Sequence, residues 1–346
     1  MRILIIVDPD HPVPPVFYGG IERVADLFAA EFTRLGHTVD LLAGPGSRRY
    51  ASGQLFIHYP PSKHRFSRAR RKIQFQLQSI IASRHCDVVC NFGRFDYLES
   101  LLYLKVPVLQ IFENPIDQLQ VDFAEQRVRG KILFQCISSH QHQSVKFSSP
   151  SIMVPNPIAT NRYSLGSGDG GYLAFLGRLT SNKGVDVAIK AAQLASKPLL
   201  IAGPVPNEPG AMEFFKNKIQ PHLFSGQVRW LGTVDDVVKQ HLLGRAEALL
   251  FPIRWDEPFG IVMTESLACG TPVIATNRAS TPDVVKDGFN GFLCSPEEPD
   301  PLVFAEAVRK LSRINRTQCR ADVESRFGIE PIASRLLAQL QSLVTV

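Results

Sequence analysis

The sequence of 346 residues lacks several features that mark particular classes of protein. No apolar run approaches the length of a membrane-spanning helix, which argues against an integral membrane protein. The six cysteines are scattered, form no Cys-x-x-Cys pair and have no histidine cluster beside them, so we expect buried free thiols and no metal centre. The segment Met1–Asp8 reaches an acidic residue too early for a signal peptide, so it is expected to form a buried strand of a cytoplasmic protein.

The glycine fingerprint of dinucleotide-binding proteins is also missing. The segment Gly19-Gly20-Ile21-Glu22 follows the first expected strand, but it is not G-x-G-x-x-G, and no acidic residue is placed for a dinucleotide ribose. A nicotinamide oxidoreductase is therefore the least favoured enzyme class. Glycines here let a backbone approach a phosphate at a helix N-terminus, although glycines are also common in ordinary tight turns.

Positive charge is unevenly distributed along the chain. The net charge of +6 lies entirely in residues 1–165, where 19 Lys and Arg face 13 Asp and Glu. Much of it is in Lys63–Lys72, and apolar positions 73, 77, 80 and 81 then share one helical face. This pattern fits either an anionic membrane surface, with a peripheral position at its inner face, or a core-facing helix with a solvated basic edge. Nucleic acid is disfavoured because no aromatic platform or binding motif accompanies the charge.

The chain is long enough for two domains, and its pattern indicates where they meet. Short apolar runs alternate with longer amphipathic stretches, as in α/β proteins with parallel sheets. The alternation lapses at a Gly/Ser-rich run over residues 164–171. We therefore expect two Rossmann-like domains, residues 1–163 and residues 164–328, followed by an amphipathic helix over residues 329–346. Open sheets of this kind bind ligands at the carboxyl ends of their strands.

Two acidic residues eight positions apart, Glu257 and Glu265, are the most informative pair. Pro258 can start a helix, and eight helical residues span about 12 Å, close to the length from the sugar to the ribose of a sugar nucleotide. Free amides at the helix start would face the phosphates, and a carboxylate accepts two sugar hydroxyls well. Taken alone, the pair fits equally an amphipathic helix with incidental acidic residues.

A second segment, residues 177–184, places two cations after the first strand of the second domain. Arg178 leaves the strand end and Lys183 opens the next helix. Arginine offers phosphate a planar fork and lysine a compact charge, so together they could hold a diphosphate. A solvated turn with ordinary surface charges is the alternative.

The acidic pair, the Ala-Cys-Gly-Thr-Pro sequence at 268–272 and the segment 177–184 together resemble the signature of retaining GT-B glycosyltransferases of family 4, the glycosyl transferases group 1. The resemblance implies that the two domains face each other across a cleft and that the last helix returns to the first domain. It also implies catalytic roles for Arg178, Lys183 and Glu257. The two cations would neutralise the leaving nucleoside diphosphate in place of a metal, and Glu257 would contact the donor sugar. The implied donor-binding residues are Gly19, Gly20, Gly177, Phe259, Gly260, Ile261, Val262 and Glu265.

The first domain departs from this family at one position. Many members carry a histidine after the strand that corresponds to residues 107–111, and here its place falls on Glu113. Either Glu113 or Asn114 takes over a polar contact, or the site is altered. His140, in a second family-like segment, is a further candidate for contact with the acceptor or the sugar. The segment 154–158, with Pro157 where the family has glycine, is expected to have a structural role at the hinge.

The resemblance implies a metal-independent enzyme of polysaccharide or glycoconjugate biosynthesis that needs no cofactor. It would move a hexosyl group from a UDP- or GDP-sugar to a hydroxyl of a glycan, lipid or small molecule, by same-face displacement with retention. Two alternatives share the architecture. A sugar-nucleotide 2-epimerase would need acid and base residues around the hexose, which the sequence does not supply convincingly. The second alternative is a degenerate protein that binds a sugar nucleotide without transferring the sugar, and the missing histidine motivates it.

Overall fold

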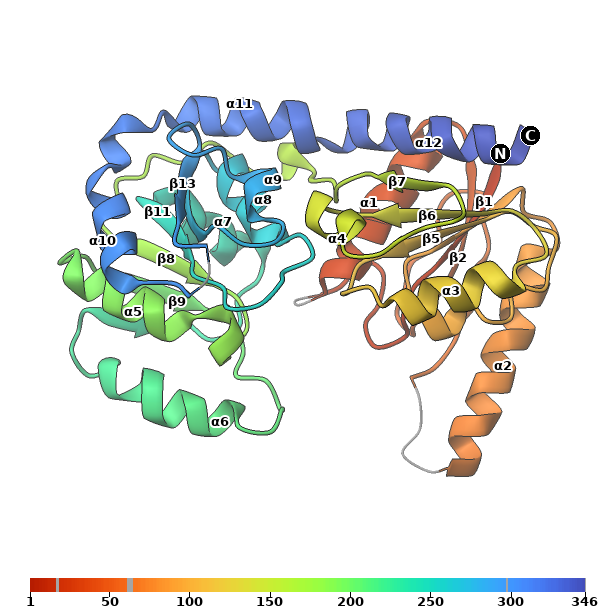
Figure 1. The fold of residues 1–346 in the computed structure, drawn as a ribbon, viewed down its shortest axis with the longest axis horizontal. Helices are drawn as coiled ribbons and strands as arrows, with labels where there is room; N and C mark the ends of the chain where they lie inside the picture. The colour runs from red at the N-terminus through yellow and green to blue at the C-terminus, as the bar shows by residue number, and fades with distance from the viewer. Residues whose placement is uncertain (17–18, 61–64, 297, 346) are drawn as a thin grey trace. The chain divides into compact units, whose positions relative to one another are not determined.

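The computed structural model describes residues 1–346 except 17–18, 61–64, 297 and 346, and the side chains of Arg65 and Arg68 are also outside the description. The chain forms two compact units (Figure 1). The first comprises Met1–Pro157 and Ile329–Val346, and the second comprises Ile158–Gly328.

The first boundary lies before the Gly/Ser-rich run, so the expected division at residues 163 and 164 is wrong. The physical reason is that the segment ahead of this run packs on the second unit. The backbone N–H of Ile158 donates to the Phe327 carbonyl at 2.8 Å, and the Tyr163 hydroxyl donates to Glu265 at 2.8 Å. The boundary therefore falls within the Pro-Asn-Pro segment at 155–157.

The first unit is built on a parallel sheet with strand order β3-β2-β1-β4-β5-β6-β7. The strands are β1 (Arg2–Ile6), β2 (Thr38–Ala43), β3 (Leu55–Ile57), β4 (Val88–Asn91), β5 (Val108–Phe112), β6 (Ile132–Cys136) and β7 (Ser151–Met153). Strand β1 is central and its residues 3–6 are completely buried, because a parallel sheet is covered on both faces. The order reverses between β1 and β4.

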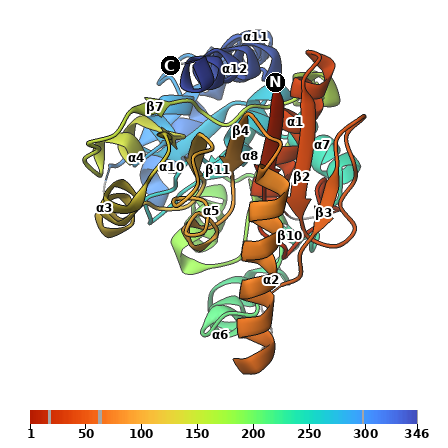
Figure 2. The same cartoon turned by 90° about the vertical axis from the view of Figure 1, so that its right-hand side faces the viewer.

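Helices cover both faces of this sheet (Figures 1 and 2). They are α1 (Gly20–Arg34), α2 (Arg65–Ser83), α3 (Gln118–Arg127), α4 (Ser139–Gln143) and α12 (Ile329–Thr345), with a 3-10 turn η1 (Phe95–Tyr97). Helices α2 and α3 pack on the face that presents Leu4 and Ile6. Helix α12 packs against α1, and Lys131 donates to the Leu343 carbonyl at 3.2 Å. The expected return of the last helix to the first unit is therefore found.

The second unit repeats the same design. Its parallel sheet has the order β10-β9-β8-β11-β12-β13, so the reversal lies between β8 and β11. The strands are β8 (Leu173–Leu176), β9 (Leu199–Ala202), β10 (Val228–Trp230), β11 (Ala248–Phe251), β12 (Val273–Thr276) and β13 (Gly291–Cys294). Both sheets thus follow the doubly wound order that places ligands at the carboxyl ends of the strands beside the reversal.

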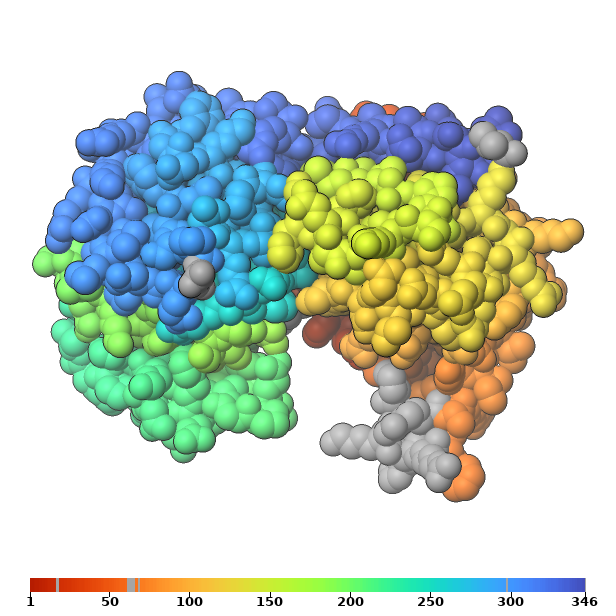
Figure 3. Space-filling model, viewed as in Figure 1, coloured from red at the N-terminus to blue at the C-terminus, as the bar shows by residue number. Residues whose placement is uncertain are grey.

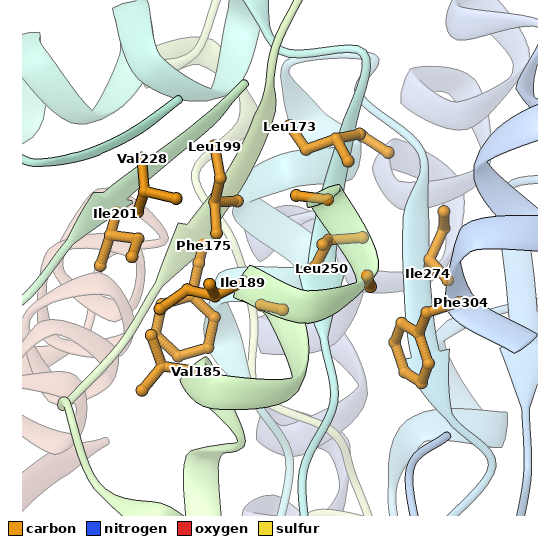
Figure 4. Close-up of a cluster of buried hydrophobic side chains, with 14 of the residues drawn as sticks. Leu173, Phe175, Val185, Ile189, Leu199, Ile201, Val228, Leu250, Ile274 and Phe304 are labelled. Carbon is orange, nitrogen blue, oxygen red and sulfur yellow. The ribbon is translucent and has the colours of Figure 1, made fainter. Parts of the chain in front are cut away.

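The helices of the second unit enclose its sheet. They are α5 (Val185–Leu194), α6 (Ala211–Phe214), α7 (Asp236–Arg245), α8 (Ile261–Ala268), α9 (Thr281–Val284), α10 (Pro301–Arg309) and α11 (Arg316–Phe327). Short turns complete them: η2 (Thr160–Arg162), η3 (Ser181–Lys183), η4 (Phe215–Ile219), η5 (Gln220–His222) and η6 (Leu311–Arg313). Figure 4 shows the core between the sheet and helices α5 and α10, where Phe175, Ile189 and Phe304 belong to one cluster of buried side chains.

Candidate functional site

The segments after β8 and β11 lie side by side in the second unit, beside the reversal of strand order. Strands β8 and β11 pair directly, and the backbone N–H of Arg254 donates to the Asn182 carbonyl at 2.8 Å. A Cβ added to Gly184 would lie 1.8 Å from the Pro252 carbonyl oxygen, so only glycine permits this approach. The structure thus brings together the two segments in which the sequence places a phosphate site and a sugar site.

Lys183 and Glu257 form a mostly buried ion pair where these segments meet. The Lys183 ammonium donates to Glu257 Oε2, and the Trp255 indole N–H donates to the same oxygen at 2.8 Å. The ammonium also lies 4.7 Å from the centroid of the Trp255 ring, a distance at which cation–π attraction operates. The sequence did not single out Trp255, because nothing near it in the chain indicates that its ring faces Lys183.

Arg254 holds this arrangement in place. Its guanidinium makes a two-pronged contact with Asp186 at 2.8 and 3.0 Å and donates to the Ser181 carbonyl at 2.9 Å. A planar fork of this kind fixes orientation as well as distance. Arg254 therefore ties the turn that carries Lys183 to the segment that carries Glu257. Arg254 could not be identified from the sequence, because its partners Ser181 and Asp186 lie 73 and 68 positions away along the chain.

Arg178 follows β8 as expected, but it points to a different partner. Its guanidinium pairs with Glu208, beyond the end of β9, and both side chains are partly exposed. Exposed ion pairs are worth about 0–1 kcal/mol, so a phosphate could displace Glu208 at little cost. The convergence of Arg178 on the Lys183–Glu257 pair therefore remains a prediction. Gly177, just before it, lies in the same segment.

Glu265 lies on α8 and is buried with two partners of its own. Its Oε1 accepts from the Lys239 ammonium at 2.6 Å and from the Tyr163 hydroxyl at 2.8 Å. Lys239 is on α7 and also pairs with Asp236 at 2.9 Å. Neither Lys239 nor Tyr163 was found from the sequence, where a lysine on a helix looks like an ordinary solvated charge.

Helix α8 begins at Ile261, so the expectation that Pro258 starts it is wrong. Gly260 stands before the helix with φ 80°, and a Cβ there would lie 2.8 Å from Met263 Cε. This left-handed residue ends the loop and sets the start of the helix. Glu257 is consequently on the loop, and the helical length between the two glutamates does not apply.

The start of α8 still offers groups suited to an anion. The first backbone N–H groups of a helix, here including Ile261 and Val262, have no partner within the helix and carry its positive dipole end. Phe259 is different, because its side chain is buried and packs edge-to-face on Phe327 with ring centroids 5.8 Å apart. Phe259 can therefore offer a ligand little more than its backbone.

In the first unit, the two predicted glycines lie at the start of α1. Gly20 is the first residue of the helix, and Gly19 before it has φ 152°. A Cβ on Gly19 would lie 2.7 Å from Pro15 Cβ and 2.9 Å from Glu22 Oε2, which explains why glycine is needed there. Glu22 is buried, and this burial raises its pKa.

Glu113 follows β5 and forms a buried acid–amide pair with Asn156. Glu113 Oε2 accepts from Asn156 Nδ2 at 2.7 Å. Within the described residues, Glu113 Oε1 and Asn156 Oδ1 are buried without a hydrogen-bond partner. The pKa of Glu113 is raised to about 7, mainly by burial and also by the nearby charge of Glu22, against the opposing effect of the Asn156 hydrogen bond. A proton on Glu113 or a donor from a ligand would satisfy these oxygens.

The two other predicted contacts of the first unit are less enclosed. Asn114 and His140 are both exposed. Gln141, next to His140 on α4, donates to the carbonyls of Phe112 and Asn114, each at 2.8 Å. Gln141 therefore holds the backbone on both sides of Glu113, a role that the sequence did not reveal.

Replacing Glu113 with glutamine should change how stability depends on pH. A raised pKa means that the folded chain binds this proton more tightly than the unfolded chain, whose ordinary value is 4.5. That stabilisation is fully present below the ordinary pKa and is lost as the pH rises through about 7. The melting temperature of the wild type should therefore fall relative to that of Glu113→Gln between about pH 5 and about pH 8. Parallel curves of melting temperature against pH for the two proteins would contradict this prediction. Glu330→Gln, which removes a carboxylate at the surface, is the control.

No group of three or more His, Cys, Asp or Glu residues suited to holding a metal ion is found in the described part of the chain.

Comparisons with known proteins point to one class. Residues 159–325, nearly all of the second unit, match the family model of the glycosyl transferases group 1. A glycogen synthase of Mycobacterium tuberculosis is 31% identical over 160 residues, 45% of this chain and 36% of the relative. A D-inositol 3-phosphate glycosyltransferase of Acidothermus cellulolyticus is 28% identical over 228 residues, 56% of this chain and 49% of the relative. The chain thus matches about a third to a half of the length of these relatives.

Solved structures match over the whole chain. The glycosyltransferase AviGT4 of avilamycin A biosynthesis has a TM-score of 0.72 at 21% identity and covers 99% of this chain and 98% of its own. Anabaena HepE, solved with UDP and glucose, has a TM-score of 0.75 at 18% identity, with 99% and 100% covered. At these identities the likeness shows the fold. The chain has the GT-B fold of two Rossmann-like domains, as the sequence predicts. Its second unit matches the family model of the glycosyl transferases group 1.

Proposed function

We propose that the chain is a retaining, metal-independent glycosyltransferase that moves a hexosyl group from a UDP- or GDP-sugar to a hydroxyl acceptor. The observation that carries the proposal is the Lys183–Glu257 pair against Trp255, beside the strand reversal of the second unit. A cation and a carboxylate held together there suit a ligand that brings a diphosphate and a hydroxyl-rich ring.

The residues of the second unit would divide the donor between them. The Lys183 ammonium has three N–H groups and gives one to Glu257, so two remain for phosphate oxygens. Glu257 would accept sugar hydroxyls, and Glu265, oriented by Lys239 and Tyr163, would accept from the ribose. The amides at the start of α8 and the Arg178 guanidinium would add to the field at the diphosphate.

Transfer would then depend on stabilising the leaving group. Negative charge grows on the leaving phosphate as the bond to the sugar breaks, and preorganised cations lower the energy of that state. In same-face displacement the leaving phosphate accepts the acceptor proton, so no protein base is required. The acceptor would bind mainly to the first unit, where Glu113, Asn114 and His140 are the proposed contacts with the acceptor or the sugar. Gly19 and Gly20, in the same unit, would contact the donor.

We also propose a cytoplasmic location. All six cysteines are free, five of them buried, and burial raises the pKa of these thiols. Free thiols persist in a reducing compartment. No helix among the described residues combines the length and the apolar content needed to cross a bilayer.

Thermal-shift screening with UDP, GDP and ADP, and with their sugars, tests the donor site. A nucleotide at 100 times its Kd stabilises the folded state by about 2.7 kcal/mol, which should raise the melting temperature by roughly 5–10 °C. A rise with one nucleobase identifies the donor class. The absence of any rise with all three would contradict the proposal.

The nucleotide sugar identified by thermal shift also distinguishes a transferase from the two alternatives, a sugar-nucleotide 2-epimerase and a binding protein. Incubation with the donor alone should give slow hydrolysis at most, whereas conversion of UDP-GlcNAc to its 2-epimer would indicate an epimerase. A nucleotide sugar that stabilises the protein but is never transferred or hydrolysed would indicate a binding protein.

A further inference from the structure

Helix α2 of the first unit has two apolar faces, and only one of them packs on the core. Phe75 and Ala82 are buried against the sheet. The opposite side carries a stripe of large apolar side chains, because positions four or seven apart share one face of a helix. Its members and their exposed fractions are Phe66 at 90%, Ile73 at 57%, Leu77 at 56% and Ile81 at 52%. Of the two alternatives that the sequence leaves open, the core-facing helix therefore does not hold for residues 73, 77 and 81.

The helix is also strongly basic and contains no acidic residue. Its five cations are Arg65, Arg68, Arg70, Arg71 and Lys72. Lys63, which the sequence includes in the basic stretch, lies outside the described residues. Arg71 donates to the Pro60 carbonyl in a partly buried contact, and Lys72 pairs with Glu99 at 3.0 Å at the surface. A net charge of this size on one helix creates a positive field along the exposed apolar stripe.

The position of α2 leaves this face accessible within the first unit. Figures 1 and 2 show the helix extending well beyond the ends of the strands. The space-filling view shows its residues, in orange, at the surface of that unit (Figure 3). Contiguous exposed apolar side chains on a protein surface mark a site of interaction.

We propose that α2 is a peripheral membrane anchor that lies on an anionic lipid surface. The apolar stripe of Phe66, Ile73, Leu77 and Ile81 enters the boundary between headgroups and acyl chains, and the flanking cations contact the negative headgroups. The positive charge of α2 favours an anionic lipid surface over a second copy of the chain as the partner of the apolar stripe. Two α2 helices packed face to face would bring like charges together with no acidic residue on either helix, whereas anionic lipid neutralises them. The proposal does not depend on the transferase activity.

Vesicle flotation tests this directly. The chain should bind vesicles that contain phosphatidylglycerol, should ignore vesicles of phosphatidylcholine alone, and should release as salt screens the charges. The triple variant Ile73→Gln, Leu77→Gln, Ile81→Gln should bind about tenfold or more weakly. Its matched control, Leu119→Gln, Leu194→Gln, Leu302→Gln, removes three exposed leucines from α3, α5 and α10 and should bind normally. Arg70→Gln should weaken binding about fivefold.

Several outcomes would contradict the proposal that α2 is a membrane anchor. Equal binding by the triple variant and its control would show that the stripe is not used, and the absence of vesicle binding at low salt would reject the surface altogether. A wild-type dimer that becomes monomeric in the triple variant, without vesicle binding, would assign the stripe to a second copy. The melting temperature of the triple variant, with and without nucleotide, shows separately whether its fold and donor site are intact.

Discussion

The variant Lys183→Ala should lose transfer by about 10²–10³-fold while keeping its fold, because one preorganised charge at a developing anion contributes about that much. Lys183 is the cation nearest Glu257, and its ammonium is positioned by Trp255 as well. Initial rates with the donor identified by thermal shift measure the effect. Lys197→Ala is the matched control, since Lys197 is also paired, with Glu247 at 2.7 Å, in the same unit.

Glu257→Ala should reduce transfer by a similar factor. The double variant Lys183→Ala, Glu257→Ala should be little less active than either single variant. The two side chains form one unit, so their effects are not additive. Circular dichroism would confirm that each variant is folded. Near-normal turnover in both single variants would mean that the site is misassigned.

Glu265→Ala should lower the free energy of unfolding of the second unit by about 3 kcal/mol, a large effect for one side chain. Glu265 and Lys239 are both buried, and removal of the carboxylate takes away the buried partner of the ammonium, which keeps the more exposed Asp236 and lies 5.8 Å from the centroid of the Tyr163 ring. A buried charge without its partner is costly because it has lost its water and gained nothing in return. Urea unfolding of the wild type and the variant measures the difference.

The double variant Glu265→Leu, Lys239→Met separates stability from binding. Replacing both partners of a buried ion pair with apolar residues is often neutral, so this protein should unfold close to the wild type. If Glu265 also contacts the ribose, the double variant will fold but will no longer be stabilised by nucleotide. A loss of less than about 1 kcal/mol in Glu265→Ala would contradict the structural role of the pair.

The parts of the fold that could be predicted from the sequence are those that depend on local pattern. The apolar runs that form residues 3–6 of β1 and the whole of β11 are buried on both faces, so they stand out against the amphipathic helices around them. The start of α8 was misplaced because Pro258 is a common first helical residue, whereas the left-handed backbone of Gly260 decides the matter. The first domain boundary was misplaced because contacts, and not composition, attach Tyr163 to the second unit.

The site was predictable only in part, for a related reason. Motif spacing selected Lys183 and Glu257, and the structure places them in contact. The residues that orient them and Glu265, namely Trp255, Arg254, Lys239 and Tyr163, come from segments whose proximity exists only in the folded chain. The periodicity of α2 likewise indicated an apolar stripe without showing whether it faces the core or the solvent.

Binding of a nucleoside diphosphate at Lys183 in the second unit is the central requirement of the proposed function. Calorimetric titration of the wild type and Lys183→Ala with the preferred nucleoside diphosphate, and with the matching monophosphate, tests this directly. We predict that the wild type binds the diphosphate more tightly than the monophosphate and that this preference is lost in Lys183→Ala. Equal affinity of the two proteins for the diphosphate would contradict the account.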